Sequence, residues 1–289
     1  MKSDAGQVYS CQAKRLKQKG TTQMTELRSL IDLSSHQLTD PVWLARKREE
    51  MDIYGAVQMN GFLTASALEE VQTEAAAGLK EAYFKPQTHN IYLDKGDDAF
   101  EAGHIRNRRF TSSKGCITDE QIPDSSVLKQ IYHHPDFISA LCVILGEETL
   151  YPYADSLSSV NVHYARHEEE LNWHFDNSSF AVTLMIKPAL AGGAFEYVRD
   201  VRKADEGDMG FEIAEAVIDG RHQIDSLSLN AGDLLLFRGR NSLHRVTPVA
   251  DDSVRHLAVL AYNSQPGISL SETAQMTFYG RIGKVTAAG

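Results

Sequence analysis

Hydrophobic positions recur at helical intervals through the first half of the chain. The stretches with this pattern are residues 40–51, 64–84 and 125–146. Asp40 is suited to cap the first of them, and Pro135 divides the last into one broken helix or two short ones. Residues 24–150 are therefore predicted to be mainly helical. A Gly-, Asp- and Asn-rich connection at 85–124 interrupts them, and connections of that length tend to be functional.

The pattern changes after Tyr151 to short runs rich in β-branched and aromatic residues, separated by Gly, Pro or Asn. These runs are SSVNVHYA, FAVTLMIK, AFEYVRD, DSLSLN, DLLLFRG, LHRVTPV and HLAVLAYN. Several short strands at such spacing indicate a β-sandwich or jelly roll over 151–265. Residues 200–222 form a charged insertion with a short helix, and 266–289 form a C-terminal segment. We predict a mainly β fold with added helices (α+β), organised as a single domain over 24–289.

Charge is distributed unevenly along the 289 residues. The formal net charge is −10, but residues 1–23 hold five basic residues and one acidic residue, which leaves 24 basic against 38 acidic residues in the remainder. We expect 1–23 to be a disordered basic extension, because its apolar content is low, and Met24 to be a possible translational start. An acidic body repels phosphate backbones, so nucleic-acid binding is not expected.

Three scattered cysteines, Cys11, Cys116 and Cys142, indicate neither a disulfide framework nor a thiolate zinc site. No window reaches the roughly 18 consecutive apolar residues of a membrane helix, and no secretory signal is visible at the start. A cytoplasmic protein without a membrane partner is the resulting expectation. The oligomeric state is left open, with a homodimer as one option.

A candidate metal site begins with WHFD, residues 173–176. Within a strand, positions i and i+2 project to the same face, so His174 and Asp176 can point at one site. The pair alone is also compatible with an ordinary surface His-Asp contact. Seventy residues later, His244 follows an apolar strand and a turn. Two histidines and one carboxylate match the facial triad of non-haem Fe(II) oxygenases.

Arg255 stands eleven residues after His244, at the head of the apolar strand HLAVLAYN. An arginine drawn inward there needs an anionic partner, whereas a surface cation would not. If Arg255 faces the interior, strand alternation also turns Leu257, Val259 and Asn263 inward. The strand would then line a pocket that has an anion anchor at one end and an amide at the other.

These motifs together resemble the Fe(II)- and 2-oxoglutarate-dependent dioxygenases over residues 150–265. The matching pieces are WHFD, AGGAFEY (191–197), GDLLLFRGRNSLHRVTPV and Arg255. The resemblance implies a double-stranded β-helix, with His174, Asp176 and His244 as catalytic iron ligands and with 2-oxoglutarate and O2 as cosubstrates. It also implies that Arg255 binds the distal carboxylate of 2-oxoglutarate. In prolyl-hydroxylase-like members, a tyrosine ten residues before the first iron histidine contacts the cosubstrate, which corresponds to Tyr164.

The layout further resembles the branch that acts on free amino acids, which contains radical halogenases and related hydroxylases. In the halogenases a small residue replaces the aspartate of His-x-Asp and leaves room for chloride. This chain keeps Asp176, so the resemblance implies hydroxylation of a small molecule, namely a free amino acid, with a cationic one as an option, or a derivative.

Candidate substrate contacts can be read less directly from the sequence. Arg108 and Arg109, in GHIRNRRF (103–110), could bind a substrate carboxylate, but a solvated basic loop explains them equally well. Asp155 could attract an amino group, and Asn177 directly follows the metal aspartate. With Asn263, these residues form the predicted substrate set.

Three other functions remain open at this stage. The first is a 2-oxoglutarate oxygenase that acts on protein side chains or nucleobases. The second is a cupin-like metal-binding sensor or structural protein without oxidative activity, and the third is a zinc hydrolase. Arg255 discriminates against the second, because a pure metal binder has no need of a buried cation eleven residues after its last ligand. The zinc hydrolase would need a general base close by, and the 2-oxoglutarate motifs would then be a coincidence.

Overall fold

The computed structural model describes residues 27–286. The predicted basic extension 1–23, Met24 and Cys11 lie outside these residues. The helices of the described part are α1 (Leu27–Leu30), α2 (Pro41–Tyr54), α3 (Ala65–Gly78), α4 (Val127–Tyr132), α5 (Pro135–Leu145), α6 (Phe211–Ile218) and α7 (Glu272–Tyr279). Short 3-10 turns occupy Leu79–Glu81, Asp119–Gln121 and Ala204–Glu206.

Fifteen strands form the β part of the described chain. They are β1 (Ala56–Met59), β2 (Tyr83–Phe84), β3 (Gln87–His89), β4 (Phe110–Ser112), β5 (Gly115–Ile117), β6 (Tyr151–Pro152), β7 (Val160–Ala165), β8 (Leu171–His174), β9 (Ala181–Lys187), β10 (Phe195–Val198), β11 (Asp225–Leu227), β12 (Leu234–Phe237), β13 (Leu243–Val246), β14 (Arg255–Leu260) and β15 (Tyr262–Asn263). All of the strand pairs are antiparallel.

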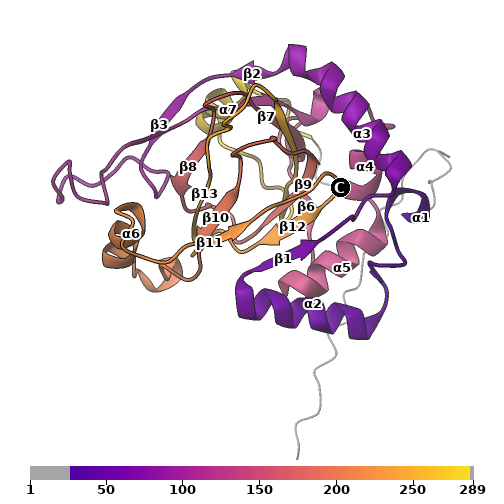
Figure 1. Cartoon of the computed structure of the whole chain (residues 1–289), viewed down its shortest axis with the longest axis horizontal. Coiled ribbons are helices and arrows are strands. Elements are labelled where there is room, and N and C mark those ends of the chain that lie inside the picture. The colour runs from indigo at the N-terminus through magenta and orange to yellow at the C-terminus, as the bar shows by residue number, and fades with distance from the viewer. Residues whose placement is uncertain (1–26, 287–289) are drawn as a thin grey trace, which may run out of the picture.

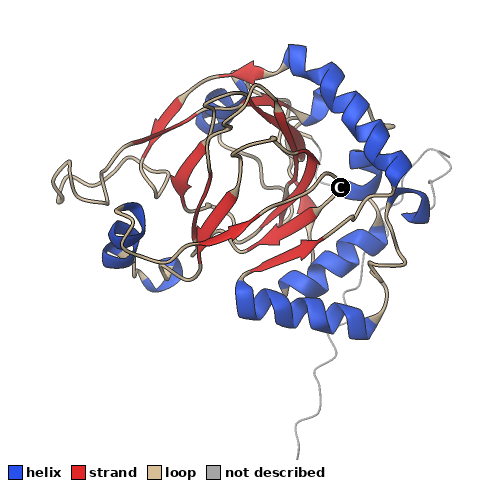
Figure 2. Ribbon diagram, viewed as in Figure 1, coloured by secondary structure: helices blue, strands red, loops and turns tan. Residues whose placement is uncertain are grey.

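Two sheets face each other and enclose the interior of the jelly roll (Figures 1 and 2). The larger has the order β1-β12-β9-β14-β7-β5-β2, and the smaller has the order β11-β10-β13-β8. The first half of the chain, which we predicted to be mainly helical, adds β1, β2 and β5 to the edges of the larger sheet. These added strands pair the two edges that β12 and β7 would otherwise leave open.

The helices begin and end where local chemistry allows. Asp40 caps α2 by accepting a hydrogen bond from the Trp43 backbone N–H at 2.7 Å, and Gly55 ends it in the left-handed conformation. The stretch 125–146 forms two helices, because Pro135 starts α5 and cannot continue α4.

The main hydrophobic core lies between the helices and the outer face of the larger sheet. Figure 1 shows α2 to α5 on that side of the molecule. The outward-facing residues of β7, β9 and β14 join Phe137 of α5 and Phe62 of the connection between β1 and α3, whose rings are 5.8 Å apart. A separate cluster, which includes Met185, Phe237 and Leu257, lies in the jelly-roll interior. One face of the larger sheet is thus committed to the helices, and the other is available to a site.

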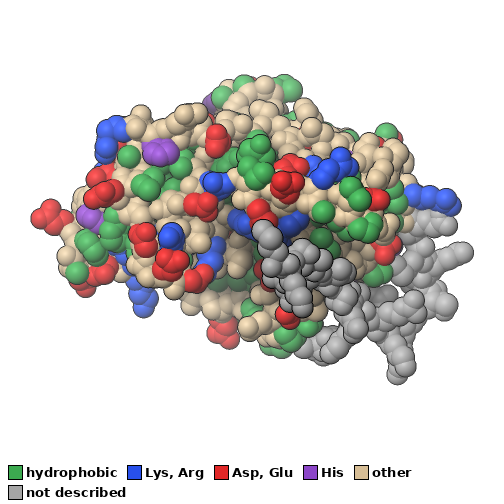
Figure 3. All heavy atoms as spheres, turned by 90° about the horizontal axis from the view of Figure 1, so that it is seen from below, with side chains coloured by type: hydrophobic (Ala, Val, Ile, Leu, Met, Phe, Trp, Pro, Cys, Tyr) green, Lys and Arg blue, Asp and Glu red, His purple; other side chains and the backbone are tan. Residues whose placement is uncertain are grey.

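The molecular surface carries charges of both signs. Figure 3 shows acidic and basic side chains interspersed over the face seen from below. Within the described residues, no helix is long and apolar enough to span a bilayer.

Replacing Phe137 by Ala should lower the free energy of unfolding by about 3–5 kcal/mol, because the fully buried ring leaves a cavity in the main core. Urea denaturation monitored by circular dichroism measures the change. Phe278, which is 38% exposed, is the matched control. Phe278→Ala should change stability far less, and equal losses for the two variants would contradict this assignment of the core.

Candidate metal centre

The three predicted metal ligands converge at the end of the smaller sheet. His174 ends β8 and pairs directly with His244 on β13, and their ring centroids lie 4.2 Å apart. Oδ1 of Asp176 lies 3.6 Å from Nε2 of His174 and 3.5 Å from Nε2 of His244. The candidate ligand atoms all lie within 4.8 Å of one another. An ion between them would be held on one side only, so coordination positions would stay open.

Backbone carbonyls orient both imidazoles. Nδ1 of His174 donates to the Asn172 carbonyl at 2.7 Å, and Nδ1 of His244 donates to the Ser242 carbonyl at 3.0 Å. Each Nε2 therefore carries its lone pair toward Asp176, as a metal ligand requires. Burial, reinforced by the neighbouring His244, lowers the pKa of His174 to about 3, so its ring is neutral. This donor set fits Fe(II).

Asp176 is positioned by backbone hydrogen bonds and by Gly239, which has no side chain to crowd the carboxylate. Its N–H donates to the Gly239 carbonyl at 3.1 Å, and its carbonyl accepts from Arg202 at 3.3 Å. A Cβ at Gly239 would lie 1.8 Å from Oδ2 of Asp176. Burial raises the pKa of Asp176, but His244, His174 and Lys114 outweigh it and leave the pKa below its ordinary value. The carboxylate is therefore ionised and ready to bind a cation.

Arg255 supplies a buried cation on the opposing sheet. It begins β14 and is only 6% exposed, and its Nε has no hydrogen-bond partner among residues 27–286. Gly193 makes room for it, since a Cβ there would lie 3.0 Å from Cδ of Arg255. Burial lowers the pKa of Arg255 to about 10, which keeps it charged at neutral pH. A buried guanidinium with a free donor fits a ligand carboxylate.

Tyr164 lies on the wrong face of β7 to contact a ligand beside Arg255. It pairs with His256, whereas Arg255 pairs with Ala165, so the two side chains project to opposite faces of the sheet. The Tyr164 hydroxyl donates to the Ala75 carbonyl of α3 at 2.8 Å. The prediction that Tyr164 contacts the cosubstrate is therefore wrong, and its role is to attach α3 to the sheet.

Asp155 is also committed to the fold. Its carboxylate accepts hydrogen bonds from the backbone N–H groups of Leu157, Ser158 and Leu270, each at 3.0 Å. These bonds join the turn before β7 to the C-terminal segment. The prediction that Asp155 binds a substrate amino group is wrong, because backbone donors already occupy the carboxylate.

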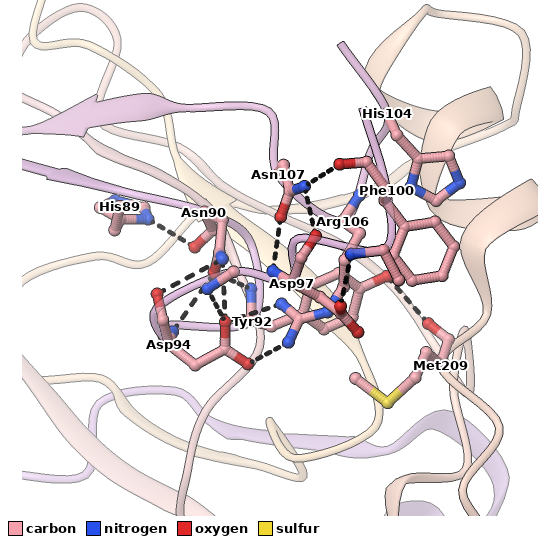
Figure 4. A network of polar contacts seen from close by, with 12 residues as sticks. His89, Asn90, Tyr92, Asp94, Asp97, Phe100, His104, Arg106, Asn107 and Met209 are labelled. Carbon is pink, nitrogen blue, oxygen red and sulfur yellow. Dashed lines mark hydrogen bonds and ion pairs between the residues drawn. The ribbon is translucent and has the colours of Figure 1, made fainter. Parts of the chain in front are cut away.

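The long connection between β3 and β4 is an ordered polar network rather than an open basic loop (Figure 4). Asp94 accepts two hydrogen bonds from Arg106 at 2.6 and 2.8 Å and is itself held by Asn90. The connection touches the metal strand, because the Phe175 N–H donates to the Ile91 carbonyl at 2.8 Å. It therefore covers the outer side of the metal centre.

Both candidate arginines of this connection have partners within the protein. Arg108 forms a 2.8 Å ion pair with Asp219 beside α6, and because this pair is partly exposed, the role of Arg108 in substrate binding stays a prediction. The exposed Arg109 donates to the Thr88 carbonyl at 3.2 Å. Asn177 is exposed in the loop after Asp176, and the Asn263 amide Nδ2 is buried without a hydrogen-bond partner among the described residues. Asn177 and Asn263 stay predictions.

The sequence analysis missed Lys114 and His163, which both project into the interior near the metal centre. Nζ of Lys114 lies 3.0 Å from Nδ1 of His163. The overlooked signal was position, because Lys114 immediately precedes the buried strand β5 just as Arg255 begins the apolar strand β14.

Replacing Gly239 by Ala should weaken metal binding by about 10- to 100-fold, the usual cost of losing outer-shell support, because the new methyl group displaces the Asp176 carboxylate. Anaerobic titration calorimetry with Fe(II) or Mn(II) measures the affinity. Gly103→Ala is the control, since a Cβ there meets nothing within 4 Å. Unchanged affinity in Gly239→Ala would remove Asp176 from the ligand set.

Replacing Tyr164 by Phe should lower the free energy of unfolding by about 1 kcal/mol, because one buried hydrogen bond to α3 is lost. Its affinity for 2-oxoglutarate should stay at the wild-type value, as measured by titration calorimetry on the metal-loaded protein. An affinity loss as large as that of Arg255→Met would place Tyr164 in the cosubstrate site after all.

Comparisons with known proteins agree with this geometry. A sequence model of the halogenase D family matches residues 39–278, whereas no curated protein matches the chain. A 2OG-Fe(II) oxygenase family protein from Burkholderia pseudomallei is 14% identical, with a TM-score of 0.51, and the match covers 78% of this chain and 93% of that one. The epimerase SnoN from nogalamycin biosynthesis is 14% identical, with a TM-score of 0.53 and coverage of 78% and 83%.

The carbocyclase SnoK from the same biosynthesis is 10% identical, with a TM-score of 0.52 and coverage of 75% and 82%. These structures share the fold, which confirms the predicted jelly roll with added helices. The family match, the fold and the His-Asp-His site together confirm an Fe(II)- and 2-oxoglutarate-dependent oxygenase over the cupin-like alternative. The chain belongs to the halogenase D family.

Proposed function

We propose that this oxygenase hydroxylates a small molecule, a free amino acid or a close derivative, and converts 2-oxoglutarate to succinate and CO2. His174, Asp176 and His244 are the proposed iron ligands, and Arg255 is the proposed anchor for the distal carboxylate of 2-oxoglutarate. The amino-acid class follows from the resemblance of the sequence to free-amino-acid hydroxylases and halogenases.

One observation carries the choice of hydroxylation, namely the position of Asp176. Its carboxylate oxygen lies about equally far from the two Nε2 atoms, at 3.6 and 3.5 Å, where a third protein ligand belongs. The radical halogenases that the sequence resembles have a small residue here, and the halide takes the vacated position. Family membership therefore does not imply halogenation by this chain.

Fe(II) and 2-oxoglutarate together supply the O2 activation and oxidising power that hydroxylation of a C–H bond needs. The protein's own groups supply position and exclusion of water. The imidazoles are fixed by their carbonyl partners, and the rings of Phe237 and Phe195 pack against His244 at 4.8 and 5.7 Å. Arg255 fixes the cosubstrate at the end remote from the metal.

A small-molecule substrate is supported by the structural relatives. SnoN has been solved with Fe3+, alpha ketoglutarate and a nogalamycin derivative, at 16% identity and a TM-score of 0.53. In this chain Asn263 keeps an unpaired amide donor that could bind a substrate carboxylate, and Asn177 lies next to the metal aspartate. Together with Arg108 and Arg109, these two amides are the proposed substrate contacts, whereas Asp155 is held by backbone donors.

Anaerobic addition of Fe(II) and 2-oxoglutarate should give the weak visible metal-to-ligand absorption of the chelated cosubstrate. Under air, a panel of free amino acids should include one that releases succinate and gains the mass of one oxygen atom. Asp176→Ala should lower the rate of this hydroxylation by more than the roughly 10- to 100-fold that follows from losing a residue that only supports a metal ligand.

The exposed Asp252 offers a matched control, and Asp252→Ala should retain wild-type turnover. The absence of the absorption band in folded, iron-loaded protein would exclude the cosubstrate assignment. A chlorinated product from the wild-type enzyme in the presence of chloride would contradict the proposed role of Asp176.

A further inference from the structure

Three neighbouring strands place two cations in one row on the interior face of the larger sheet. Arg255 pairs with Ala165, and Gly115 pairs with Tyr164, so the same register carried one residue further sets Lys114 beside Ala165. The row therefore reads Arg255, Ala165, Lys114 across β14, β7 and β5. Strands lie about 4.8 Å apart, so the two cationic residues are about 10 Å apart at the backbone. Ala165 carries only a methyl group, so no long side chain of β7 separates the two cations in this row.

The Lys114 side chain is directed by His163 rather than by an acid. Its Nζ lies 3.0 and 3.2 Å from the two ring nitrogens of His163, and the structure shows no ion pair for it within residues 27–286. Burial, followed by the charges of Lys114 and Arg255, lowers the pKa of His163 well below its ordinary value. His163 is therefore a neutral partner that holds the ammonium without neutralising its charge.

An interior that contains two cations and no paired carboxylate for either needs a ligand anion. Burying an unpaired charge is costly, and hydrogen bonding to an opposite charge offsets the cost. Asp176 is the carboxylate whose charge acts on Lys114, and in the proposed function it belongs to the metal. Because Ala165 is small and lies between the two cations in the row, both of them can approach a single carboxylate from opposite sides.

We propose that Lys114, held in place by His163, is a second cationic anchor for the distal carboxylate of 2-oxoglutarate. The inference rests on the proposed function, which already assigns Arg255 to that carboxylate. Lys114 is favoured for it because it shares a row with Arg255 on the larger sheet, while the two histidine ligands come from the opposing sheet. Lys114 is a positioning residue here and takes no part in oxygen chemistry.

The test compares ligands that differ only at the distal end. 2-Oxoglutarate and 2-oxopentanoate share the metal-binding keto acid, but a methyl group replaces the distal carboxylate in the second. Their dissociation constants are measured anaerobically by titration calorimetry on Mn(II)-loaded protein. Succinate is measured as well, because it has the carboxylate but lacks the metal-binding keto acid. Wild-type protein should prefer 2-oxoglutarate strongly.

Lys114→Met should reduce that preference by about 10- to 100-fold, the value of a charged hydrogen bond, and leave 2-oxopentanoate affinity unchanged. Lys114→Arg should restore part of the preference. The exposed Lys80 is the matched control, and Lys80→Met should behave as wild type. Arg255→Met should show a loss of the same kind as Lys114→Met.

Each other outcome has a separate meaning. If wild-type protein fails to bind 2-oxoglutarate, the proposed function is wrong and this inference is overturned with it. If wild-type protein binds it and Lys114→Met keeps the full preference, only the inference is overturned. If Lys114→Met weakens the binding of both keto acids equally, Lys114 has a structural role and the inference is overturned. The inference is also overturned if Lys114→Met changes only the KM of the amino-acid substrate.

Discussion

The cross-strand pairing of β8 with β13 is the interaction on which the site depends. It brings His174 and His244, which are separated by 70 residues in the chain, into direct register on one face of a sheet. Because each imidazole also donates to a carbonyl two residues before it, both rings are oriented by their own strands. The metal site is thus largely built by backbone geometry, and a shift of one residue in register would turn one histidine away from the other.

The two sheets divide the chemistry between them. The smaller sheet contributes neutral imidazoles, and Asp176 follows from the loop after β8, while the larger sheet contributes Arg255 and Lys114 from two of its strands. The remaining interior is filled by an apolar cluster that includes Met185, Phe237 and Leu257. In the proposed function, this arrangement places the metal-binding end on the smaller sheet and the anion-binding end on the larger sheet. It suits a ligand that has a chelating group at one end and a carboxylate at the other.

The sequence was most informative where a local pattern determined the chemistry. His-x-Asp and the later histidine could be predicted because the motif spacing is specific, although Asp176 lies in the loop after β8 and not in the strand. The prediction for Tyr164 was wrong by a single residue, because the sequence VNVHYA does not reveal which alternate residues face inward. His163 faces inward instead. Lys114 was missed because three-residue strands such as β5 carry too little periodicity to be recognised. Asp155 was misassigned because one of its partners, the backbone of Leu270, is distant in sequence. The ion pair of Arg108 with Asp219 could not be predicted for the same reason.

The charges in the interior also constrain how ligands must bind. Arg255 and Lys114 outweigh the single negative charge of Asp176, and a divalent metal would add two further positive charges. Metal alone would therefore increase an existing excess of buried positive charge, whereas a dianionic cosubstrate reduces it. An interior with this excess of positive charge disfavours a chloride ligand less than an acidic interior would. In the proposed function, exclusion of halide would therefore come from the Asp176 carboxylate as the third metal ligand, rather than from the field of the surrounding protein.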